Sequence, residues 1–61
     1  MAIRVDYSII DDTFGREVCR RFQVFETDDI ETAKEMAREW KWKCGYGGSY
    51  SVKFHSYEYL Y

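Results

Sequence analysis

The stretch that decides the fold is residues 28–44, DDIETAKEMAREWKWKC. Its apolar side chains recur at spacings of three and four, at Ile30, Ala33, Met36, Ala37, Trp40 and Cys44. This spacing gathers them in one stripe of an α-helix, with charged residues on the opposite side. Asp28 or Asp29 can cap the helix N-terminus, and Glu31 follows Asp28 at capping-box spacing. Gly45 and the glycines after it end the helix.

Alternating patterns on either side of this helix predict three β-strands. Residues 3–10 alternate apolar and polar side chains, as a half-buried strand does. Residues 17–25 form a second run after a turn at 11–16, where Asp side chains and Gly15 favour chain reversal. Residues 49–60 form the third run. The chain therefore reads strand, strand, helix, strand.

Chirality sets the expected arrangement of these elements. The first two strands form a hairpin, and a right-handed crossover through the helix places the third strand beside the first. We expect an α+β fold of the ββαβ type in a single domain, residues 1–61, whose three-stranded antiparallel sheet has the order 2-1-3 and one helix packed on one face. The expected core comprises Ile3, Val5, Tyr7, Ile9, Val18, Phe22, Val24, Ile30, Ala33, Ala37, Trp40, Val52 and Phe54. In the second strand, Arg20 is the misfit on the face expected to be buried.

Length and composition exclude several classes of protein. A chain of 61 residues buries only about 60% of the surface that its unfolded form exposes. We therefore do not expect a self-contained enzyme, and we assign no catalytic residue. The chain has no apolar run near the roughly 20 residues of a membrane span, and its N-terminus has no signal-peptide pattern. We expect a cytoplasmic protein without a membrane partner.

The cysteines and the histidine do not predict a metal centre. Cys19 and Cys44 show neither CxxC nor Cys/His spacing, which favours free thiols in a reducing cytoplasm; one disulfide is the alternative. His55 is the only histidine, and the carboxylates are scattered, whereas a zinc site needs about four ligands at defined spacing. We expect no metal and no cofactor.

The first candidate binding surface is on the helix, around Trp42. This residue lies opposite the apolar stripe, and Arg38 is placed four residues earlier, where it can stack on the ring. Trp and Arg are enriched in the hot spots of protein interfaces. The alternative is that the helix frays and Trp42 folds back onto the core or the loop at Tyr46.

The second candidate surface is the sheet face that the helix does not cover. We expect it to present Arg4, Asp6, Arg21, Gln23, Phe25, Lys53, His55 and Tyr57. Three interpretations stand: pairs that stabilise a thin sheet, protein recognition through the face or an edge, and single-stranded nucleic-acid binding. The nucleic-acid interpretation uses Lys53, His55, Tyr57, Arg4 and Arg21. The net charge of −2 favours a protein partner. The aromatic residues left outside the expected core are Trp42, Phe25, Tyr57, Tyr59 and Tyr61.

Residues 25–37, FETDDIETAKEMA, lead from a strand through an acidic cap into a helix, and a short aromatic strand follows. This pattern resembles small phage-encoded ββαβ inhibitors, namely the inhibitors of bacterial RNA polymerase from T7-like phages and some small anti-CRISPR proteins. The resemblance implies a non-enzymatic binder that blocks a larger machine of the host. The resemblance to the polymerase inhibitors implies that basic residues of the third strand and an acidic strip meet the target; here that strand offers only Lys53 and His55.

The leading hypothesis is a small cytoplasmic protein-binding module whose partner is a host protein complex. The residues expected to contact the partner are Trp42, Arg38, Arg4, Arg21, Phe25, Lys53, His55, Tyr57 and Tyr59. The first alternative is a single-stranded nucleic-acid binder. The second is a homodimer that pairs through bare sheet faces or edges, since unprotected strands favour association; a monomer and a homodimer both remain open.

Overall fold

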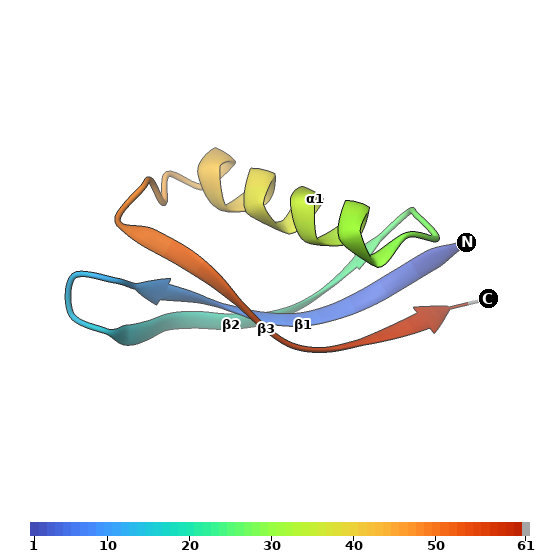
Figure 1. The fold of residues 1–61 in the computed structure, drawn as a ribbon, viewed down its shortest axis with the longest axis horizontal. Helices are drawn as coiled ribbons and strands as arrows, with labels where there is room; N and C mark the ends of the chain where they lie inside the picture. The colour runs from blue at the N-terminus through green and yellow to red at the C-terminus, as the bar shows by residue number, and fades with distance from the viewer. Residues whose placement is uncertain (61) are drawn as a thin grey trace.

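The computed structural model describes residues 1–60 and has the predicted ββαβ order (Figure 1). Strands β1 (Ala2–Asp11) and β2 (Arg16–Phe25) form a hairpin, helix α1 (Ile30–Lys43) follows, and strand β3 (Tyr50–Leu60) ends the described chain. The sheet has the order β2-β1-β3, and both pairings are antiparallel. The α+β fold class and the strand order are therefore confirmed. Tyr61, which we predicted to be a surface aromatic, lies outside the described residues.

Helix α1 lies along one face of the sheet, over β1 and β3, and the β1–β2 hairpin extends beyond its C-terminal end (Figure 1). Asp29 is the N-cap: its carboxylate accepts hydrogen bonds from the Glu31 backbone N–H at 3.2 Å and from the Thr32 hydroxyl at 2.9 Å. The N-cap is therefore Asp29, and the capping box expected between Asp28 and Glu31 is not formed. Gly45 ends the helix with a φ of +89°, a left-handed conformation that glycine adopts without strain. No helix within residues 1–60 is long and apolar enough to cross a membrane.

The face assignment of β2 was wrong. In the β1–β2 ladder, Tyr7 pairs with Arg21 and Ile3 with Phe25, so alternate residues from Cys19 to Phe25 lie under the helix. Val18, Phe22 and Val24, which we expected in the core, are 41%, 60% and 50% exposed. The physical reason is that β2 carries apolar residues on both faces, and its register is set by the four-residue turn and by a bulge opposite Ile9 and Ile10.

A second bulge lies in β3, where the register shifts between the partners of Asp6 and Tyr7. His55 is the extra residue, because Phe54 pairs with Tyr7 and Ser56 pairs with Asp6. Beyond this point the alternation is inverted. Tyr57 pairs with Val5, on the helix side of the sheet, and not on the uncovered face where we had placed it.

The core is centred on Tyr7, which is fully buried. Its ring lies 6.2 Å from the rings of Trp40 and Phe54 and 6.5 Å from that of Phe25, measured between centroids, and burial raises the pKa of its phenol. The other buried apolar residues are Ile3, Val5, Ile9, Ala33 and Ala37. The expected core members Ile30, Trp40, Val52 and Phe54 pack against this cluster but are only partly buried. Cys44, expected in the apolar stripe, is exposed.

Candidate functional site

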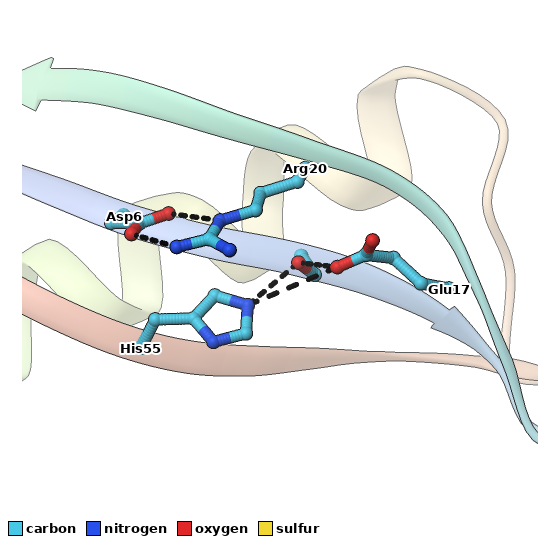
Figure 2. A network of polar contacts seen from close by, with 5 residues as sticks. Asp6, Glu17, Arg20 and His55 are labelled. Atoms are coloured by element: carbon cyan, nitrogen blue, oxygen red, sulfur yellow. Dashed lines mark hydrogen bonds and ion pairs between the residues drawn. The ribbon is translucent and has the colours of Figure 1, made fainter.

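The sheet face that points away from α1, called the outer face below, holds a network of polar contacts at its centre (Figure 2). The network joins β1, β2 and β3 through five residues: Asp6, Ser8, Glu17, Arg20 and His55. In a three-stranded sheet with one helix, this face has no apolar layer over it within residues 1–60. Asp6 and Ser8 are nevertheless buried, so their polar atoms need partners within the protein.

Asp6 and Arg20 form a two-pronged ion pair across β1 and β2. The Arg20 Nε donates to Asp6 Oδ1 at 3.0 Å, and a terminal nitrogen donates to Oδ2 at 2.6 Å. The Asp6 side chain is 7% exposed, whereas that of Arg20 is 50% exposed. The hydrogen bonds from Arg20 hold the pKa of the Asp6 carboxyl below its ordinary value, and burial opposes them to a lesser extent.

This ion pair predicts a specific dependence of stability on pH. Because the pKa of Asp6 in the folded protein lies below its ordinary value of 3.8, the stability from the ion pair is fully present above that pH. It is lost as the pH falls through the folded pKa. We measure urea unfolding at pH values from about 7 to about 2. We expect Asp6→Asn to lower the free energy of unfolding most at neutral pH, and we expect this free energy to fall less steeply than that of the wild type as the pH is lowered. The control Glu39→Gln, on the exposed side of α1, should show the wild-type dependence of the free energy of unfolding on pH. If Asp6→Asn lost stability in acid as steeply as the wild type, the Asp6–Arg20 pair would not be the source of this dependence.

Ser8 is fully buried on the outer face and connects the other two strands. Its hydroxyl donates to the Glu17 carboxylate on β2, and the His55 Nε2 on β3 lies 2.7 Å from the Ser8 Oγ. His55 Nε2 and Glu17 Oε1 are 3.9 Å apart. The Glu17 carboxylate thus accepts the hydrogen bond from the Ser8 hydroxyl, and the His55 imidazole donates to the Ser8 Oγ. Ser8 therefore links the three strands, and its hydroxyl proton is directed at Glu17 and not at the imidazole of His55.

Three basic groups of the outer face have carboxylate neighbours. Arg4 lies 3.3 Å from Glu58, Arg20 binds Asp6, and His55 lies near Glu17. Lys53, on the same face, forms no ion pair with a carboxylate among residues 1–60. Most basic groups of the outer face are therefore paired with carboxylates. The face does not have the continuous positive track that single-stranded nucleic-acid platforms use.

Phe22 and Val24 form an exposed apolar strip on the outer face, called the β2 strip below. They pair with Asp6 and Arg4, which places them on the side away from the helix. They are 60% and 50% exposed, and the Arg4 guanidinium carbon lies 5.5 Å from the Phe22 ring centroid. Sequence reasoning missed the strip because it placed both residues in the core. Arg20 counts against burial of the face that carries Phe22 and Val24, but Arg21 counts equally against burial of the other face, so charge alone does not identify the strip.

The predicted contact residues do not form one surface. Arg4, Lys53 and His55 lie on the outer face as predicted. Arg21 and Phe25 do not: the Arg21 guanidinium carbon lies 3.8 Å from the Trp40 ring centroid, and Phe25 is 6% exposed. Both occupy the helix side because of the β2 register.

The other predicted contact residues lie on the helix or on the helix side of β3. Trp42 is 60% exposed, as predicted, but Lys41 and not Arg38 lies over its ring, and the ring edge faces Gly47 in the following loop. Arg38 instead binds Glu35 at 2.5 Å. Tyr57 and Tyr59 pack edge to face with ring centroids 5.6 Å apart and are 52% and 39% exposed. Trp42 and the outer face therefore lie on opposite sides of the sheet.

A groove of about 400 Å³ runs between the first turns of α1 and the middle of β3. Its lining residues are Val5, Ile30, Lys34, Phe54, His55, Ser56 and Tyr57. We call it the β3 groove. In the described part of the chain, no group of three or more potential metal ligands comes together, and both cysteines are free.

Comparisons with known proteins add no functional information, because no family model, curated protein or solved structure matches the chain.

Proposed function

We propose that this protein is a non-enzymatic binding module that covers a surface of a larger protein complex. The observation that carries the proposal is the β2 strip: Phe22 and Val24 are exposed side by side with two arginines, Arg4 and Arg20, on a face without a helix. An exposed aromatic ring flanked by arginine is the chemistry of interface hot spots. Paired charges around it suit the polar rim of a protein interface.

The charge pattern supports a protein partner over single-stranded nucleic acid. Three basic side chains on the outer face have carboxylate neighbours. Tyr57, the tyrosine of the nucleic-acid interpretation, pairs with Val5 on the helix side. A nucleic-acid platform needs unpaired positive charge together with several accessible rings on one face. Phe22 is the exposed large aromatic residue on the described outer face.

The resemblance to phage-encoded ββαβ inhibitors gives the proposal its finer form. We propose that the protein acts in the cytoplasm of a bacterial host and that its target is a macromolecular complex, either RNA polymerase or a CRISPR effector. It would act by occupying a surface of that complex. The β2 strip is the proposed contact, and Trp42, on the opposite side of the sheet, is the alternative one.

Inhibition assays on purified complexes test this proposal. Increasing amounts of the protein are added to transcription by bacterial RNA polymerase and to DNA cleavage by CRISPR effectors. We expect inhibition in one of the two, and we expect Phe22→Ser to weaken it by about thirtyfold, as loss of a hot-spot residue does. Phe14→Ser is the matched control, since Phe14 is 74% exposed but lies in the β1–β2 turn.

Two outcomes would count against the proposal. Full activity of both complexes at every concentration would remove the inhibitor function. Equal inhibition by Phe22→Ser, Phe14→Ser and the wild type would remove the β2 strip from the interface. A parallel Trp42→Ala variant then shows whether the contact lies on the helix side instead.

A further inference from the structure

Strand β3 forms one edge of the sheet and leaves a long row of backbone groups available. It spans 11 residues, Tyr50–Leu60, and pairs with β1 on one side only within the described chain. Unpaired N–H and C=O groups on such an edge are a template for another strand. The side chains of β3 decide which strand fits.

The sequence of β3 is complementary to itself when it is read in the opposite direction. An antiparallel copy with its two-fold axis between His55 and Ser56 brings Lys53 opposite Glu58 of the second copy, and Glu58 opposite its Lys53. The same register brings Phe54 opposite Tyr57 and Val52 opposite Tyr59. Opposite charges and aromatic or β-branched residues directly across from each other are the pairs that stabilise antiparallel sheets.

The bulge at His55 is what makes this register consistent with the faces of the sheet. Lys53 and Glu58 are five residues apart, so in a regular strand they would point to opposite faces. In this structure Lys53 pairs with Ser8 and Glu58 pairs with Arg4, both on the outer face. Phe54 and Tyr57 likewise share the helix side, because they pair with Tyr7 and Val5.

We propose that two copies of this chain pair antiparallel through β3 to form a continuous six-stranded sheet. Pairing would cover Tyr57 and Tyr59, which are 52% and 39% exposed in the single chain. The β3 groove lies on the helix side beside Phe54, where Tyr57 of the second copy arrives, and supplies the space for its ring. Lys53, which forms no ion pair among the described residues of its own chain, gains a carboxylate partner.

The other edge of the sheet does not fit a second copy in this way. Strand β2 carries Arg16, Arg20 and Arg21 against one carboxylate, Glu17. Like charges on an edge strand oppose its association with an identical strand. Dimerisation through β3 leaves the β2 strip of each copy free, so this inference does not depend on the proposed inhibitory function.

Charge exchange across the interface tests the proposal with the purified protein alone. Native mass spectrometry and sedimentation equilibrium should give twice the 7.4 kDa chain mass for the wild type. Lys53→Glu and Glu58→Lys each place like charges opposite each other twice, so each variant should dissociate to the chain mass. Mixed in equal amounts, the two variants restore both opposite-charge pairs, and we expect a heterodimer with one copy of each.

The mixing step shows whether a variant dissociates because its interface is altered or because it is misfolded. Far-UV circular dichroism verifies that each variant is folded. Arg16→Glu, on the β2 edge, and Lys43→Glu, on the exposed side of α1, are controls that should remain dimeric. A wild-type mass of one chain at concentrations up to about 1 mM would overturn the proposal. So would a dimer that survives both charge reversals, or one that Arg16→Glu alone disrupts.

Discussion

Replacing Tyr7 with alanine is expected to unfold most of the protein at 25 °C. Tyr7 is fully buried, and its ring lies between Phe25, Trp40 and Phe54. Removing a buried aromatic side chain costs about 3 to 5 kcal/mol through lost transfer free energy and the cavity left behind. A single core in a chain of this size rarely supplies more than about 3 to 5 kcal/mol in total. Urea unfolding followed by circular dichroism measures the effect.

Tyr7→Phe is the matched control, because it keeps the ring and removes only the hydroxyl. In the wild type this hydroxyl donates to the Gln23 Oε1 at 2.6 Å. Loss of one hydrogen bond to a partly buried amide should lower the free energy of unfolding by about 1 kcal/mol. If Tyr7→Ala kept a cooperative transition within about 1 kcal/mol of the wild type, the core would not be centred on this ring.

Replacing Lys41 with methionine is expected to lower the free energy of unfolding by about 1 to 3 kcal/mol. Lys41 is 6% exposed, and its Nζ donates to the Gly47 carbonyl at 3.2 Å and to the Tyr50 carbonyl at 2.7 Å. These bonds tie the last turn of α1 to the start of β3. Methionine keeps the aliphatic volume of the side chain, so the loss in free energy of unfolding measures the removal of the hydrogen-bond donor to these two carbonyls.

Lys43→Met, at an exposed position two residues away, is the matched control and should change stability by less than about 0.5 kcal/mol. Chemical denaturation of both variants under identical conditions gives the comparison. A Lys41→Met protein that is as stable as the wild type, or more stable, would mean that the cost of burying the ammonium cancels what its hydrogen bonds contribute.

The helix was predictable because its signal is local. The stripe that starts at Ile30 and the acidic cap lie within a few residues of each other, and the structure has the helix at Ile30–Lys43. Lys41 could also have been found: Ala33, Ala37 and Lys41 follow each other at spacings of four, which puts the lysine on the buried side. A lysine can occupy such a position when its ammonium reaches backbone carbonyls, here those of Gly47 and Tyr50 beyond the helix.

The candidate site was predictable only in part, because it depends on which residues meet across strands. Trp42 is exposed as its helical position indicates, and Lys53 and His55 lie on the outer face. Phe22 and Arg21 were placed on the wrong faces, since β2 alternates apolar residues on both sides and a slip of one residue exchanges them.

The sequence by itself determined the elements, their order and the sheet topology, because periodicity, capping and crossover handedness act along the chain or follow from chirality. Tertiary structure alone decided which face of β2 is buried, where β3 bulges and which charges pair. Asp6 meets Arg20 and Ser8 meets His55 only after three strands have aligned. Those contacts join residues 14 and 47 positions apart, and such register-dependent pairs leave no periodic signal in the sequence.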